Sequence, residues 1–373
     1  MSRNRVIYQS EALFVSDGTL IPTAVHAANK IKQLHRVQSA NYGFSVARQD
    51  VNQFGNLARI DAIILEPPTV NLDFTYYLHS GNNETALGFS VGTGLGTTRS
   101  FISGLIDATQ TADTSTLSGR NFHIFTAPEG NDANNAAGVA FTGDQASTIT
   151  IGNGFVTNYS LEASVGNLPT VSVSVEGLNI NVVEGSTGVL PSLTVETSTA
   201  TSNGFTLPTP SSGDIGISAL RPGDIVMELA DPVLTDMPTG VDSGNTAAHI
   251  QSFSIEVPIG RTTLQRLGTR FGFAKVIDFP IEVTVNVSAT LADLRAAGNL
   301  IDFVNADTTK TLISRFKDAS VTDNICYQVK GCKLVSENFS SSIGDNKSVD
   351  LVFTTQIGAP QDTTNGVFVA TTV

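Results

Sequence analysis

Cysteine and histidine are the residues most able to bind a metal or attack a substrate, and the sequence holds two cysteines and five histidines. Cys326 and Cys332 are separated by five residues, which is neither a zinc-knuckle nor a thioredoxin spacing, and no second pair completes a site. We expect two unpaired thiols in a reducing compartment, since a hairpin disulfide requires a turn at Lys330-Gly331. The histidines stand in no metal-binding or triad motif, at positions 26, 35, 79, 123 and 249. These residues predict no metal and no cofactor.

Other residue patterns that could support catalysis are equally weak. The glycine-rich run 92–96 is not Gly-x-Gly-x-x-Gly and lacks a following Lys-Ser/Thr, so it predicts a flexible loop and not a phosphate cradle. Carboxylates are abundant, but nothing singles out a pair that could serve as the acid and base of a glycosidase. We therefore expect a protein that is not an enzyme.

Composition and charge narrow the class further. The 373 residues can form two or three domains, and the low share of charged residues (15%) with 33 glycines and many Thr, Ser, Val and Asn favours β-rich architecture. The net charge is −13, and no cluster of Lys and Arg is present. Tight nucleic-acid binding needs such a cluster, whereas an acidic surface lets DNA pass without adhering. The sequence shows no signal peptide and no apolar run long enough to span a membrane.

An internal repeat determines the expected arrangement of the chain. Shifted by 213 positions, residues 37–78 align with 250–291 without a gap, and Gln38, Arg48 and Gly55 meet Gln251, Arg261 and Gly268. A second block, 156–175, aligns with 334–353 at an offset of 178. Both blocks keep a period-two apolar pattern, so the chain reads as two fused copies of one domain.

The repeat gives boundaries. We predict a first domain over 1–180, a Ser/Thr/Gly/Pro-rich linker or surface excursion over 181–221, and a second domain over 222–373. The offset falls by 35 between the two blocks (213 − 178), so the first copy carries about that many extra residues. We place this insertion at about 79–150 and expect it to decorate the outside of the assembly.

Each copy is expected to consist mainly of strands. In each copy, a strand and a returning strand flank a polar loop. A strongly alternating strand follows, over 70–76 in the first copy and 283–289 in the second. An antiparallel pair ends each copy, 155–165 with 170–180 in the first and 333–343 with 348–357 in the second. The spacing predicts a helix over 292–304, with 101–106 as its counterpart in the first copy. The glycine shared by the two loops is expected at positive φ.

The two polar loops, 49–56 and 262–269, are the candidate site. Each holds apolar residues at matched positions, since Val51 meets Leu264 and Phe54 meets Leu267 just before the shared glycine. An exposed apolar tip on a polar loop suits insertion into a neighbouring subunit, and packing of these side chains onto their own domain is the alternative. The candidate contact residues are Gln49, Asp50, Phe54, Gly55, Thr262, Thr263, Leu267 and Gly268.

Two runs of the first copy resemble tail tube proteins of tailed bacteriophages. They are 36–57, continued by Pro67-Pro-Thr-Val-Asn-Leu-Asp-Phe-Thr-Tyr-Tyr77, and 159–178. The resemblance implies a β-sandwich or barrel domain with a short flanking helix and a long loop between early strands. In that family six such domains form a ring, rings stack into a tube, and the loop reaches the adjacent ring. The lumen is commonly acidic and conducts DNA into the host.

Two copies per chain imply that three chains complete a six-domain ring with pseudo-sixfold symmetry. We therefore expect a virion tail protein, assembled in the host cytoplasm, that associates with itself and with other tail proteins such as a sheath, tape measure, neck or baseplate. The alternative is a neck, tail-terminator or baseplate protein that forms one ring and does not polymerise. A more distant alternative is a carbohydrate-binding tail protein, against which the absence of Trp and the 7% of aromatic residues weigh.

Overall fold

The fold is mainly β, as predicted. The computed structural model describes residues 11–17, 31–64, 68–95, 99–106, 119–127, 132–133, 146–184, 187–189, 204–207, 225–229, 248–264, 267, 274–291, 309–317, 323–341 and 348–372. Among these residues the helices are α2 (Asn82–Leu87) and the 3-10 helix η3 (Phe101–Leu105), and strands make up most of the rest. The helix predicted over 292–304 lies outside the described residues.

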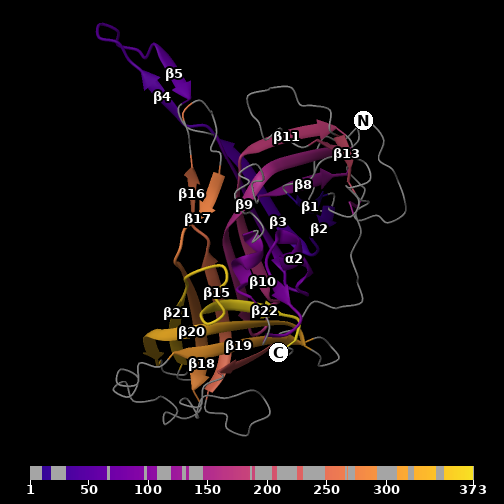
Figure 1. Cartoon of the computed structure of the whole chain (residues 1–373), viewed down its shortest axis with the longest axis vertical. Coiled ribbons are helices and arrows are strands. Elements are labelled where there is room, and N and C mark those ends of the chain that lie inside the picture. Colours follow the sequence, from indigo (N-terminus) through magenta and orange to yellow (C-terminus); the bar gives the residue numbers. More distant parts are fainter. Residues whose placement is uncertain are drawn as a thin grey trace.

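A continuous eight-stranded antiparallel inner sheet forms the centre of the molecule (Figure 1). Its six central strands alternate buried apolar residues with exposed or half-exposed polar ones, so that one face packs on the core and the other meets solvent. In spatial order they are β3 (Val37–Ser45), β6 (Thr69–Tyr77), β10 (Thr170–Gly177), β9 (Ser147–Ser164), β15 (Ala248–Pro258), β18 (Ile281–Leu291), β21 (Ser348–Ile357) and β20 (Asp323–Ser340).

The inner sheet consists of two four-stranded halves with the same strand order and the same register. In the first half (β3-β6-β10-β9) Ala40 lies opposite Phe74, and in the second (β15-β18-β21-β20) Phe253 lies opposite Val287, each 213 positions later. Irregularities also coincide, because β3 and β15 bulge at Gln38 and Gln251, and β9 and β20 bulge at Thr157 and Val335. The two sequence blocks therefore occupy equivalent positions in the sheet.

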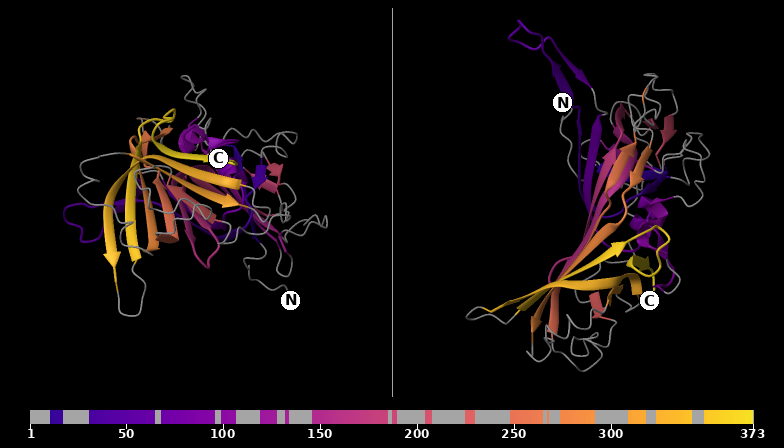
Figure 2. Two further views of the ribbon diagram at one scale, coloured as in Figure 1. Left: turned by 90° about the horizontal axis from the view of Figure 1, so that it is seen from below. Right: turned by 60° about the vertical axis from the view of Figure 1, so that its left-hand side comes forward.

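A second layer covers one face of the inner sheet (Figure 2). It is continuous with the first because β9 and β20, at 18 residues each, are long enough to pair in both layers. The first halves of these strands pair with outer strands: β8 (Arg120–Thr126) and β11 (Asn179–Glu184) on β9, and β19 (Lys310–Lys317) and β22 (Gly366–Ala370) on β20. Beyond these lie β1 (Glu11–Asp17), which pairs with β8 and with β2 (Ile31–Gln33), and β14 (Ile225–Leu229), which pairs with β19.

One apolar core runs through both halves between the two layers. It contains the inward-facing residues of the inner sheet, such as Phe74, Val173, Ile255 and Val285, together with residues of the outer strands. Aromatic contacts connect the halves, because the ring of Phe101 lies 5.0 Å from Tyr159 and 6.4 Å from Tyr327, centroid to centroid. A core shared in this way holds the halves as one packed unit.

The segment predicted as an insertion contributes to this core. Leu87 on α2, Phe89, and Phe101 on η3 are buried, and the rings of Phe89 and Phe101 stack with centroids 4.1 Å apart. The segment also reaches the second half, since β7 (Val91–Gly92), inside the predicted glycine-rich loop, pairs in parallel with β22. The described residues of this segment, 79–95 and 99–106, therefore join the two halves behind the inner sheet, and its place on the outside of an assembly stays a prediction.

Two β-hairpins project from the same end of the inner sheet (Figure 1). We name them the first arm, β4 (Arg48–Val51) with β5 (Asp61–Ile64), and the second arm, β16 (Arg261–Leu264) with β17 (Ala274–Ile277). Figure 2 shows the first arm extending away from the rest of the chain. In the region predicted as a linker, β11 ends at Glu184 and a small hairpin follows, β12 (Thr187–Val189) with β13 (Gly204–Thr206).

Candidate functional site

The arms carry most of the residues singled out from the sequence. Gln49 and Asp50 lie on β4 and Thr262 and Thr263 on β16, while Phe54 and Gly55 lie at the tip of the first arm. Gly55 closes the turn at a φ of 94°, as expected, and the Asn56 amide donates to the Gln53 carbonyl oxygen over 3.2 Å. Leu267 is described at the second tip, and Gly268 lies outside the described residues.

The arm tips expose large apolar side chains completely. Phe54, Leu57 and Leu267 are more than 100% exposed relative to a reference side chain, and further apolar side chains of the arms are 37–52% exposed (Val51, Ile60, Ile63, Ile64, Leu264 and Val276). In this single chain the tips do not fold back onto their own domain. Large apolar side chains exposed in this way are typical of surfaces that contact another macromolecule.

The base of the second arm is anchored by buried charge. The Nε of Arg261 donates to the carbonyl oxygen of Val156 over 3.1 Å, and its guanidinium lies 5.1 Å from the centroid of the Phe155 ring. Lys275 pairs with Glu176 beside the same ring. Burial lowers the pKa of Arg261 to about 10, which the Glu176 carboxylate partly opposes, so the group is still a cation at neutral pH.

The outward face of the inner sheet, which we call the polar face, carries short hydroxyl and amide side chains and six carboxylates. These are Asp73, Glu162 and Glu176 in the first half and Glu256, Glu282 and Asp350 in the second, by the pairing register. On the described strands of this face the basic residue is Lys333, at its margin. Lys275 neutralises the charge of Glu176, and the other five carboxylates give the face a negative potential that repels phosphate groups.

Within the core, one carboxyl group joins three tyrosines across the two halves. Tyr76 and Tyr159 donate hydrogen bonds to Oε1 of Glu84 over 2.8 and 3.2 Å, and the hydroxyl groups of Tyr159 and Tyr327 lie 2.7 Å apart. Since Tyr159 gives its one proton to Glu84, Tyr327 donates to Tyr159. Burial raises the pKa of Glu84 to about 7 against the two tyrosine hydrogen bonds, which favour the charged form. All four side chains are buried, so this tyrosine cluster is closed to a substrate.

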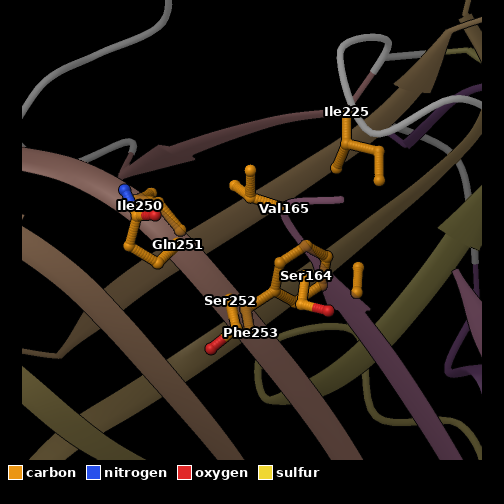
Figure 3. Close-up of a pocket in the computed structure, with 8 residues that line it drawn as sticks. Ser164, Val165, Ile225, Ile250, Gln251, Ser252 and Phe253 are labelled. Atoms are coloured by element: carbon orange, nitrogen blue, oxygen red, sulfur yellow. The ribbon is translucent and has the colours of Figure 1, made fainter. Parts of the chain in front are cut away.

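A small hollow lies where the two halves meet (Figure 3). It has a volume of about 70 Å³, well below the roughly 300–1,000 Å³ of ligand pockets. Its lining comes from the ends of β9 and β15 and from the start of β14: Ala163, Ser164, Val165, Ile225, Ile250, Gln251, Ser252 and Phe253. Neither its size nor these side chains suit a cofactor.

Neither cysteine forms a disulfide, and both are buried on one strand, β20, which continues through Gly331 without reversing. Burial raises the pKa of the Cys332 thiol to about 12, so it is protonated at neutral pH. Within the described ranges, no three His, Cys, Asp or Glu side chains gather as metal ligands. Among those residues no helix has both the length and the apolarity needed to cross a membrane.

The sequence matches no protein-family model and no curated protein sequence.

Sequence reasoning missed the tyrosine cluster and the two edges of the inner sheet. Tyr76, Tyr159 and Tyr327 stand at apolar positions of alternating strands, so their hydroxyl groups gave no separate signal. Glu84 lies in the predicted insertion, and only the tertiary structure brings it beneath them. The edge residues were visible as an alternating pattern, but strand order was needed to show which strands lack a neighbour.

Proposed function

We propose that this chain is a structural protein of a bacteriophage tail tube, in which three chains form a ring of six tube-like domains and rings stack around a channel for DNA. Each domain contains one half of the inner sheet and the outer strands attached to it. The resemblance of residues 36–57 and 159–178 to tail tube proteins first suggested this function.

The observation that carries the proposal is the polar face. An eight-stranded sheet continuous across both halves leaves one whole face without a covering layer in the described chain, and six carboxylates stand on it. If this face lines a channel, the phosphates of DNA meet negative charge and short hydroxyl groups. DNA then slides without adhering, because binding would need clustered cations that release counterions.

The arms support stacking of the rings. Both project from one end of the sheet and both end in fully exposed apolar side chains, Phe54 and Leu57 in one and Leu267 in the other. In a ring, six such arms would point along one direction toward the adjacent ring. Burial of these side chains in the neighbouring ring would supply the free energy of stacking.

Electron microscopy of the purified protein tests the proposal. We expect hollow tubes built of rings with three chains each and an apparent sixfold outline. Rings of six chains, or a protein that remains monomeric at high concentration, would contradict it. Single rings that never stack would indicate the neck, tail-terminator or baseplate alternative.

A further inference from the structure

The junction between the two halves of the chain is a complete strand-to-strand interface. β9 pairs with β15 in antiparallel register over seven residue pairs, from Ser164 opposite Ser252 to Asn158 opposite Pro258. Two more hydrogen bonds extend it, from the Val165 amide to Gln251 over 2.8 Å and from the Ile259 amide to Thr157 over 2.7 Å. Its inward-facing side chains are almost fully buried: Tyr159, Leu161, Ala163, Phe253, Ile255 and Val257.

The free edges of the inner sheet are the equivalents of these same two strands. β3 corresponds to β15 by the offset of 213, and the second half of β20 corresponds to that of β9 by the offset of 178. Among the described residues, β3 pairs within this sheet only with β6, and the second half of β20 only with β21. The two edges of the inner sheet thus carry the two strands that would form the same interface as the β9–β15 junction at its centre.

The edges expose the side chains that the central junction buries. Tyr42 and Phe44 on β3 are 44% and 69% exposed, while their counterparts Ile255 and Val257 are 2% and 0% exposed. Phe339 on β20 is 46% exposed, against 0% for its counterpart Leu161. An exposed edge strand with aromatic residues is prone to pair with another strand, so a protein that keeps one has a partner for it.

We propose that β20 of one chain pairs with β3 of a second copy of this chain, antiparallel and in the register of the central junction. The offsets translate that register directly, so Tyr42 lies opposite Phe339 of the neighbour, and Asn41 lies opposite its Ser340. This edge pairing deepens the proposed ring, on which it rests, by naming the strands and the residue pairs that close it.

One residue makes the edge pairing weaker than the central junction. Glu337 stands on the core side of β20 where the first half has the buried Tyr159, and the register places it opposite Phe44 of the neighbour. An inward-pointing charge on an edge strand discourages indiscriminate pairing, at some cost to the correct contact. The edge pairing between two chains also lacks the ion pair of Lys275 with Glu176. Ala62 stands at the position equivalent to Lys275 by the offset of 213, and Thr354 stands at the position equivalent to Glu176 by the offset of 178.

Cysteine cross-linking tests the register. Hydrogen bonds at residues 165 and 157 of the central junction make Glu162–Ser254 a non-hydrogen-bonded pair, whose side chains lie closest. The equivalent pair is N41C with S340C, on the exposed polar face. Mild oxidation of the assembled double variant should give covalent species up to a closed trimer, whereas β3 and β20 of the same chain lie at opposite ends of the sheet.

The control is N41C with N338C, two residues out of register, where diagonal neighbours lie too far apart for a disulfide without distortion. Tubes that form without N41C–S340C cross-links, or that cross-link better through N41C–N338C, would overturn the edge pairing and leave the tube function standing. Trimers that cross-link in register but never stack would support the edge pairing and contradict the tube.

A second variant strengthens the edge. E337Y installs the residue of the central junction, so we expect half-maximal ring assembly at about tenfold lower protein concentration in sedimentation velocity experiments. An unchanged or higher concentration would count against the edge pairing.

Discussion

Glu84 is a fully buried ionisable residue. Its carboxyl group lies inside the core, where it accepts hydrogen bonds from Tyr76 and Tyr159 and is connected through Tyr159 to Tyr327. A buried polar network of this kind fixes one arrangement of the surrounding elements, because any other leaves hydroxyl groups without partners. Here it fixes α2 and the two halves of the inner sheet relative to one another.

The pH dependence of stability should report this carboxyl group. Burial raises the pKa of Glu84 from 4.5 to about 7. Below pH 4.5 the group is protonated in both states, and as the pH rises toward 7 the unfolded chain loses this proton first. The free energy of unfolding therefore falls across this window, by on the order of 3 kcal/mol. Urea denaturation of the wild type and of E84Q between pH 4 and 8 measures the effect.

E84Q keeps the acceptor oxygen but does not titrate, so its stability relative to the wild type should increase with pH over the same window. His123, whose pKa burial lowers to about 3, is present in both proteins and cancels in the difference. Parallel stability curves for the two proteins would show that the pKa of Glu84 is the same in the folded and the unfolded state.

At the scale of elements, the first arm differs from the central strands of the inner sheet because it buries no side chain of its own. Arg48, Gln49, Asp50 and Val51 are all exposed on β4, and the described contact between side chains there is a surface ion pair, Arg59–Asp50. Such a pair contributes little in water. An isolated two-stranded hairpin is marginally stable, so the arms need a partner surface to become rigid.

Polar arm tips should prevent stacking and leave the ring intact. F54D combined with L267D places charges where apolar side chains would enter the next ring, so burial becomes unfavourable. We expect rings without tubes by electron microscopy, and unchanged unfolding of the single chain, because both side chains are fully exposed. V182D is the matched control, since Val182 is also an exposed apolar side chain, at 62%, and lies on β11, which is part of neither arm and is neither edge strand of the inner sheet. Tubes from the arm variant would refute this role of the tips.

The sequence predicted the strands of the inner sheet better than it predicted the segments that connect them. Period-two alternation placed β6, β10, β18 and β21 well, because each has one face on the core. The loops over 49–56 and 262–269 turned out to be partly paired arms, since short polar strands lack an apolar face and give no periodic signal. The core role of residues 79–106 was also missed, because Gly- and Asn-rich composition hides the few side chains, such as Phe89 and Phe101, that are buried.

On the scale of the whole molecule, charge is distributed by face. The polar face holds three carboxylates from each half, of which Glu176 pairs with Lys275, and Lys333 lies at the margin of the face. A ring would repeat this pattern around its channel, so the potential inside is negative at every domain.

Reversing charge on the polar face should make the channel retain DNA. E162K combined with E256K adds two cations per chain on adjacent strands at the middle of the face. We expect the variant tubes to bind duplex DNA at 50 mM salt, with affinity falling steeply toward 200 mM, and the wild type to bind none. E162Q with E256Q is the control that removes charge without adding cations. Equal binding by the lysine and glutamine variants would show that this face does not meet DNA.

Residues 79–95 and 99–106 join the halves of one chain through β7, η3 and the tyrosine cluster, but the described residues include no equivalent segment at the edges β3 and β20, where two chains would meet. A ring would therefore alternate three strong interfaces, each between the two halves of one chain, with three weaker interfaces, each between two chains. Under mechanical load or mild denaturant it should break at the weaker interfaces and release whole chains, each with its eight-stranded sheet intact. Such chains could close into rings again without refolding, so disassembly would be reversible long before any strand melts.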